Sequence, residues 1–224
     1  MPETGVRFPS PAPRNIPAIA RIAMGIMKGY EGVWEGNFPS ARPFSMEEEA
    51  HYILQAAKGN PEAFGALYDR YHQQIYRFVY LKVSTKEDAE DITHQVFLNA
   101  WKQMRHYTHT GHPFSSFLYR IARNLVIDHY RAKKAHVALE AAAELPSADA
   151  PEEQAERQLL EAEVMRAIRL LKPDYQDVLI MRFIEELSLK EVAAILGKSE
   201  GAVKLLQHRA MRRLRQLLPP SLTL

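Results

Sequence analysis

The stretch "SLKEVAAILGKSEGAVKLLQHRAMRRLRQLL", residues Ser188–Leu218, predicts two helices joined by a tight turn. Ser188 and Glu191 form the S-x-x-E pattern of a capping box, in which each side chain accepts a hydrogen bond from the other residue's backbone N–H. Gly197 can take the positive φ that ends a first helix. Ser199 can then cap the second helix.

The spacing of three residues makes this turn specific. Counting from Leu189, Ala193 is the fifth residue, Gly197 the ninth and Val203 the fifteenth. The small residue lets two helices approach, the glycine makes the turn, and the β-branched residue packs the second helix down. The combination predicts a helix-turn-helix, whose second helix enters the major groove of DNA.

Projected at about 100° per residue, the second helix has an apolar face and a cationic face. The apolar face comprises Val203, Leu206, Ala210, Leu214 and Leu217. The opposite face carries Lys204, His208, Arg212 and Arg215, with Arg209 on its flank. Such a face can simply be solvated, but its place in a helix-turn-helix favours contact with DNA. The exposed Leu205 either packs on a neighbour or touches a thymine methyl group.

The composition is that of a soluble protein with one large or two small domains. The chain has 224 residues, of which 46% are hydrophobic and 25% charged, and it has no cysteine. Disulfides, thiolate zinc sites and cysteine nucleophiles are therefore excluded. Lys and Arg exceed Asp and Glu by 12 to 10 over Met46–Lys134 and by 8 to 6 over Pro173–Leu224, but number 4 against 8 over Ala135–Lys172. Two basic-leaning modules joined by an acidic tether are indicated.

We expect an all-α fold of two small helical domains joined by a flexible acidic linker, because helical periodicity dominates and no strand candidate stands out. Residues 1–45 are rich in Pro, Gly and Ser and predict a disordered arm, unless Met46 is the natural start. Residues 46–134 are expected to form the first domain, 135–154 the linker, and 155–224 the helix-turn-helix domain.

The first domain should contain several amphipathic helices. Residues 61–83 place one apolar stripe on a buried helix: Phe64, Leu67, Tyr71, Ile75, Phe78 and Val79. Thr85 can cap the next helix, and Ser115 or Ser116 a third one, after a loop over His106–Phe114.

The sequence predicts no metal site, no catalytic site and no membrane-spanning helix. His106, His109 and His112 are evenly spaced, but no carboxylate or cysteine lies near them in the sequence, so a metal site is not favoured. No cofactor and no catalytic constellation are predicted. The apolar stretch Ile16–Met27 contains Arg21 and is shorter than the roughly 18 residues of a spanning helix, so no membrane insertion is expected.

Two segments together carry a resemblance to a known family. "DAEDITHQVFLNAW" (Asp88–Trp101) and "FLYRIARNLVIDHYRAKK" (Phe117–Lys134) resemble the second conserved region of extracytoplasmic-function (ECF) sigma factors, and Leu171–Leu218 is similar to their fourth region. The resemblance implies a cytoplasmic, non-enzymatic subunit that binds core RNA polymerase and directs promoter recognition, melting and transcription initiation. It also implies an anti-sigma partner, whose identity the sequence does not give.

The resemblance also implies three sets of site residues. The core polymerase set is Asp88, Glu90, Asp91, Gln95 and Phe97, although the family usually has Gln-Glu where this chain has His94-Gln95. The DNA set of the second region is Arg120, Arg123, Asn124, Arg131, Lys133 and Lys134, beside a pocket for a flipped base bounded by residues 104–116. The DNA set of the fourth region is Ser199, Lys204, Leu205, His208, Arg209 and Arg212.

One alternative from another class stays open at this point. A helix-turn-helix also occurs in stand-alone transcriptional regulators, in which an N-terminal domain senses a ligand or a phosphate. Such a sensor would need a pocket, or an acidic phospho-acceptor at the end of a strand, and no strand is visible in the sequence.

Overall fold

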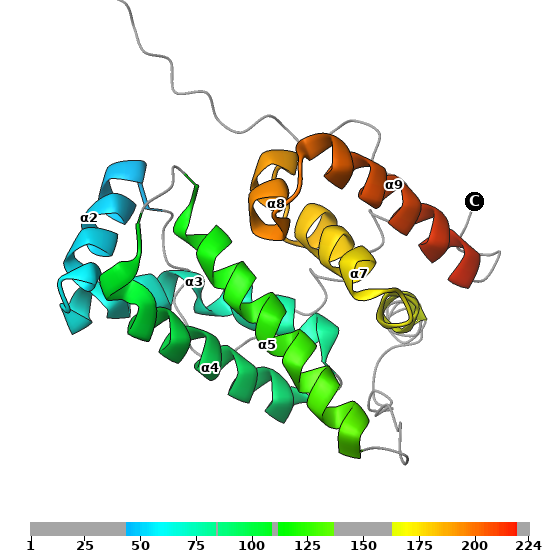
Figure 1. The fold of residues 1–224 in the computed structure, drawn as a ribbon, viewed down its shortest axis with the longest axis horizontal. Helices are drawn as coiled ribbons and strands as arrows, with labels where there is room; N and C mark the ends of the chain where they lie inside the picture. The colour runs from blue at the N-terminus through cyan, green and yellow to red at the C-terminus, as the bar shows by residue number, and fades with distance from the viewer. Residues whose placement is uncertain (1–43, 84, 109–111, 137–162, 219–224) are drawn as a thin grey trace, which may run out of the picture.

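The computed structural model describes residues 44–83, 85–108, 112–136 and 163–218 (Figure 1). All regular structure in these ranges is helical, which confirms the predicted all-α fold. The predicted arm lies outside the described residues except for positions 44 and 45, as does most of the predicted linker. None of the helices in these ranges is long and apolar enough to cross a membrane.

The N-terminal helical unit, residues 44–136, contains four α-helices. They are α2 (Met46–Ala57), α3 (Pro61–Lys82), α4 (Lys86–Gln103) and α5 (Phe114–His136), with a short 3-10 turn, η2 (Met104–His106), after α4. Local sequence starts three of them. Ser45 and Glu48 form a capping box at α2, the Asn60 side chain accepts from the Ala63 N–H at α3, and Thr85 caps α4 as predicted.

The core of this unit is built on α3. Five of the six predicted stripe residues are buried: Leu67, Tyr71, Ile75, Phe78 and Val79. The sixth, Phe64, is half-buried and packs its ring against Trp101 of α4, with centroids 4.9 Å apart. Phe78 meets the fully buried Tyr119 of α5 edge to face, with centroids 5.2 Å apart. Aromatic pairs at such distances stabilise the fold beyond what the burial of their apolar area contributes. The helices α3, α4 and α5 therefore form a well-packed bundle.

The C-terminal helical unit, residues 163–218, begins with a helical segment over residues 163–169. It continues with α7 (Pro173–Leu179), a π-helical turn η3 (Ile180–Ile184), α8 (Leu189–Leu196) and α9 (Glu200–Leu217). The π-turn is followed by Glu186 at φ +54°, a conformation that non-glycine residues adopt only when their surroundings enforce it. π-turns occur preferentially at functional positions.

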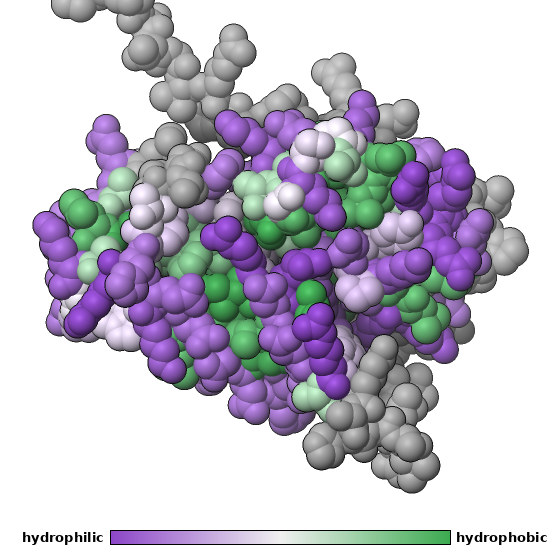
Figure 2. All heavy atoms as spheres, in the orientation of Figure 1, coloured by the Kyte–Doolittle hydropathy of each residue, from purple (hydrophilic) through white to green (hydrophobic). Residues whose placement is uncertain are grey.

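The two units lie against each other. Figure 1 shows α7 and α8 beside α5, and α8 contacts α5 while η3 contacts α3. The surface in Figure 2 is mainly hydrophilic, with apolar side chains in small patches. The large apolar side chains that are exposed in the described ranges are Leu54, Leu98, Leu170 and Leu205. Three of them lie on three different helices, and Leu170 lies in the turn before α7.

The start of α5 differs from the prediction. The helix begins at Phe114, so Ser115 and Ser116 lie inside its first turn and the prediction that one of them caps the helix was wrong. Instead, the carboxylate of Glu49 on α2 accepts the Phe114 N–H at 2.9 Å and the Tyr71 hydroxyl at 2.7 Å. A residue 65 positions earlier therefore fixes the end of the loop that precedes α5.

Removing the Glu49 carboxylate should therefore destabilise the N-terminal unit. Glu49→Ala leaves a buried tyrosine hydroxyl and a helix-terminal N–H without their acceptor, which we expect to lower the free energy of unfolding by about 1–3 kcal/mol. Glu47→Ala removes an exposed carboxylate from the same first turn of α2 and should cost less than about 0.5 kcal/mol. Urea denaturation followed by circular dichroism makes the comparison, and equal losses would refute this role for Glu49.

Candidate nucleic-acid interface

The helix-turn-helix forms as its sequence predicts. Ser188 Oγ accepts the Glu191 N–H at 3.2 Å, and Glu191 Oε2 accepts the Ser188 N–H at 2.7 Å, so the capping box at α8 is complete. Gly197 ends α8 in the left-handed conformation, at φ +62°. Ser199 then caps α9 through the Ala202 N–H at 3.2 Å. The turn is specified by residues within fifteen positions of each other.

The core side of α9 largely matches its projected apolar face. Val203, Ala210 and Leu214 are buried, and Leu206 and Leu217 are half-buried against the core. Met211 is also buried, although the projection did not include it. A flexible methionine can fill an irregular gap beside the main stripe, which a projection of ideal geometry does not reveal.

The opposite side of α9 is an exposed cationic face. All six side chains predicted to bind DNA from this unit are exposed: Ser199, Lys204, Leu205, His208, Arg209 and Arg212. Arg213 and Arg215 are exposed as well. Leu205 has half of its surface in water, so its packing alternative is not realised within the described residues. The face combines several exposed cationic side chains with one exposed apolar side chain, Leu205.

The predicted DNA set on α5 separates into two groups. Arg120, Asn124 and Arg131 are exposed, and Arg131 lies 3.3 Å from Asp128 in a pair that solvent weakens. Arg123 instead donates from Nε to Asp177 at 2.6 Å and from a terminal nitrogen to Asp174 at 2.7 Å. Its guanidinium therefore binds carboxylates of the C-terminal unit. The Lys134 side chain lies outside the described residues.

Asp88 and Lys133, predicted for different partners, lie against each other. Lys133 Nζ is 3.4 Å from Asp88 Oδ2, and His129 Nε2 is 3.5 Å from the same oxygen. Partial burial alone would raise the pKa of the Asp88 carboxyl, but the Thr85 hydrogen bond and the nearby His129 and Lys133 together lower it. Asp88 therefore joins α4 to α5.

The other predicted polymerase contacts on α4 differ in exposure. Glu90, Asp91 and Gln95 are exposed, whereas Phe97 is buried and packs on Tyr68 with ring centroids 4.7 Å apart. This burial corrects the expectation that Phe97 stands on the contact surface, since its ring belongs to the core. Leu98, the next residue, is about half exposed, so an apolar side chain is accessible on this surface at the neighbouring position.

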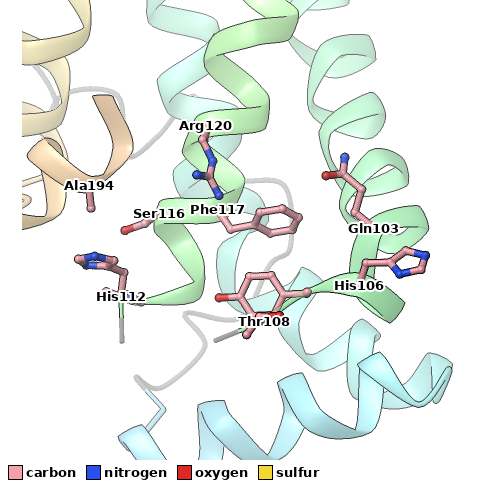
Figure 3. A pocket seen from close by; sticks show the side chains of 10 residues that line it. Gln103, His106, Thr108, His112, Ser116, Phe117, Arg120 and Ala194 are labelled. Carbon is pink, nitrogen blue, oxygen red and sulfur yellow. The ribbon is translucent and has the colours of Figure 1, made fainter. Parts of the chain in front are cut away.

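A cavity of about 230 Å³ lies between the end of α4, the following loop and the first turns of α5 (Figure 3). Its aromatic wall is made by Tyr107 and Phe117, whose centroids are 4.9 Å apart. Burial raises the pKa of the Tyr107 phenol, which is therefore a neutral hydroxyl. Gln103, His106, Thr108, His112 and Arg120 supply polar groups. Aromatic faces with a few polar groups suit a planar base.

Two lining residues of this cavity have features that the sequence did not reveal. The hydroxyl of Ser116 is buried and has no hydrogen-bond partner among the residues that the structure describes, so it is available to a ligand. Ala194 comes from α8, in the C-terminal unit, and so the second unit forms part of the rim. Neither role has a local sequence signal.

The histidines do not form a metal site within the described ranges. No group of three or more His, Cys, Asp or Glu that could hold a metal ion occurs there, and His109 lies outside those ranges. His106 and His112 instead line the cavity, where Figure 3 shows them on opposite sides. Their ring nitrogens can serve as donors or acceptors to a bound base.

Comparison with known proteins identifies both helical units. Residues 67–136 match the family Sigma-70 region 2, and residues 167–216 match Sigma-70, region 4. The chain is similar to the ECF RNA polymerase sigma factor SigW of Bacillus subtilis, with 32% identity over 74% of this chain and 94% of SigW. It is 38% identical to the ECF RNA polymerase sigma factor BldN of Streptomyces coelicolor over 75% of this chain, a match that spans 64% of the length of BldN.

A solved structure shares this fold. CnrH, in its complex with the cytosolic domain of CnrY, superposes with a TM-score of 0.59 at 26% identity, covering 76% of this chain and 96% of CnrH.

Two glycine substitutions test the turn before α9. A Cβ added at Gly197 or at Gly201 would meet no heavy atom within 4 Å, so only the backbone decides the outcome. Gly197→Ala should lower the free energy of unfolding by about 1 kcal/mol, because alanine is strained at positive φ. Gly201→Ala, in a helix, should be neutral or stabilise by up to about 1 kcal/mol. Thermal unfolding distinguishes the two, and effects of equal sign would contradict the assignment.

Proposed function

The chain belongs to the ECF group of the sigma-70 family, and we propose that it directs promoter recognition, melting and initiation as a dissociable subunit of bacterial RNA polymerase. The observation that carries the proposal is the exposed cationic face of α9 on a complete helix-turn-helix. With α5 and its cavity on the same chain, this face gives two separate contacts with one promoter. The protein would act in the cytoplasm, without catalytic chemistry of its own.

In the C-terminal unit, α9 would enter the major groove of the distal promoter element. Lys204, Arg209 and Arg212 would neutralise phosphates, while His208 can donate or accept at a base edge. Leu205 is exposed on the same face and can contact a thymine methyl group. These roles assign the electrostatic part of affinity to the arginines and lysine, and base preference to one turn of the helix.

In the N-terminal unit, the cavity would hold a base flipped from the melted strand. Phe117 and Tyr107 offer aromatic surface, and Ser116 offers a buried hydroxyl to which no group of the described ranges is hydrogen-bonded. An extruded base is read by stacking and by hydrogen bonds to its polar edge. Arg120 and Asn124 are exposed on α5, where they can bind the strand beside it.

The exposed surface of α4 would dock on core polymerase. Glu90, Asp91 and Gln95 are polar, and Leu98 is apolar and half exposed. A small apolar centre with a polar rim is the usual composition of a protein interface. Family membership also predicts an inhibitory protein partner. CnrH, which shares the fold, was solved with the cytosolic domain of CnrY.

The alternative of a stand-alone regulator with an N-terminal sensor domain is no longer supported. The N-terminal unit matches Sigma-70 region 2 over residues 67–136, and no strand that could carry a phospho-acceptor occurs in the part of the chain that the structure describes.

Reconstituted transcription tests the proposed function. The purified chain is mixed with bacterial core polymerase and a library of promoter fragments, and run-off transcripts are sequenced. We expect co-elution with core polymerase and initiation from a defined subset of fragments. A chain that neither binds core polymerase nor directs initiation would refute the proposal.

The role of the α9 cations predicts a specific salt dependence. Replacing Arg212 or Lys204 by Ala should reduce the slope of log K against log salt for promoter binding by roughly 0.9, because one phosphate contact fewer releases one counterion fewer. Lys58→Ala removes an exposed lysine at the end of α2 and should leave the slope unchanged. A wild-type slope in the Arg212 and Lys204 variants would mean that these cations are merely solvated.

A further inference from the structure

A network of ion pairs joins the C-terminal unit to the DNA-binding side of the N-terminal unit. Three carboxylates of α7 and the turn after η3 face three cations and one tyrosine of α3 and α5. The carboxylates are Asp174, Asp177 and Glu185, and their partners are Arg77, Lys82, Tyr119 and Arg123. We call this set the interdomain ion-pair network. It connects residues that are 51–108 positions apart in sequence.

The centre of the network is buried. The side chains of Lys82 and Asp177 are only 1% and 0% exposed, and Lys82 Nζ donates to Asp177 Oδ1. Burial lowers the pKa of Lys82, and the Asp177 carboxylate partly offsets this effect. Asp177 Oδ2 also accepts from Arg123 at 2.6 Å, so one carboxylate of the C-terminal unit serves two cations of the other. A charge buried this deeply needs its partner.

A second, bidentate contact fixes the orientation. Arg77 donates from Nε and a terminal nitrogen to the two oxygens of Glu185, both at 2.7 Å. Tyr119 donates its hydroxyl to the same carboxylate at 3.0 Å. The π-turn η3 and the positive φ of Glu186 set the backbone on both sides of Glu185. The strained backbone is thus located beside Glu185, where the C-terminal unit contacts α3 and α5.

The network occupies Arg123, a residue that the proposed promoter contact also requires. The Arg123 guanidinium donates to Asp174 and Asp177, so two carboxylates take the place that phosphate oxygens would take. The same placement brings Ala194 of α8 to the rim of the base cavity. The C-terminal unit therefore covers part of the surface on which the melted strand would lie.

We propose that this arrangement is an autoinhibited state, in which Asp174, Asp177 and Glu185 hold the C-terminal unit on the promoter-melting surface of the N-terminal unit. Opening exchanges the ion pairs for solvent or for DNA phosphates and uncovers Arg123 and the cavity. Core polymerase, which must present the two units to two separate promoter elements, would favour the open state. The inference rests on the proposed function, since it concerns the regulation of the same DNA site.

Fluorescence energy transfer can follow the opening directly. Because the chain has no cysteine, Glu62→Cys on α3 and Gln216→Cys on α9 provide two labelling positions that are exposed and outside the network. In the full chain, Asp177→Asn removes the partner of a buried lysine and should lower transfer efficiency. The Kd of the free chain for a fluorescent single-stranded DNA of mixed sequence should then fall about tenfold or more. The cationic face of α9 is exposed in both chains, so its contribution cancels.

Two further variants keep the test decisive. Asp174→Asn removes a half-exposed carboxylate whose loss strands no buried charge, so it should fold normally and shift both readouts in the same direction by less. The double variant Lys82→Met/Asp177→Leu replaces the buried pair by apolar groups of similar volume and should stay closed, with wild-type transfer. Circular dichroism establishes that each variant is folded.

The outcomes separate this inference from the proposed function. Unchanged transfer in both Asp174→Asn and Asp177→Asn, or lower transfer without tighter DNA binding, would overturn autoinhibition even if the wild-type chain directs transcription. Failure of the wild-type chain in reconstituted transcription would instead refute the proposed function, whatever the transfer measurement shows. Lower transfer together with tighter binding supports autoinhibition.

Discussion

The buried charge of Lys82 is the constraint on which the arrangement of the two units depends. An ammonium group that water cannot reach requires a carboxylate, and Asp177 of the other unit supplies it. Such a pair gives little net stability compared with an apolar contact, because both charges lose their hydration. The pair instead restricts geometry, because any placement of the two units that leaves one buried charge unpaired is energetically unfavourable. The ion pair therefore determines where the C-terminal unit lies more than how stable the fold is.

Under the proposed autoinhibition, the same constraint gives one surface of this sigma factor two uses. Arg123 binds carboxylates in this structure, whereas promoter DNA would offer phosphate oxygens with similar geometry. Charged contacts can be exchanged in water at small net cost, because the separated ions recover their hydration. An apolar contact of the same extent would expose its whole area on opening. A polar interface is thus suited to a protein that changes partners. Under the proposed function, the two Sigma-70 regions at its sides would contact separate promoter elements.

The part of the fold that could be predicted is the part that neighbouring residues specify. The capping box at Ser188, the turn at Gly197 and the stripe on α3 each depend on residues a few positions apart, so a single sequence reveals them. Ion pairs between residues 51–108 positions apart leave no such signal, and Arg123 was accordingly assigned to DNA alone. The prediction of the α5 cap was wrong for the same reason. Its acceptor is Glu49, while Ser116, which has the right residue type for a cap, lines the cavity.

Quantitative lysine footprinting by mass spectrometry tests the account most directly. An amine-reactive reagent should modify Lys82 in the free chain at least about tenfold more slowly than the exposed Lys86 on the next helix, because reaction must wait for opening. The lowered pKa of Lys82 would by itself speed the reaction, so protection can only reflect burial. Asp177→Asn should abolish the protection. If Lys82 reacts as fast as Lys86 in the free wild-type chain, the closed arrangement does not describe this protein in solution.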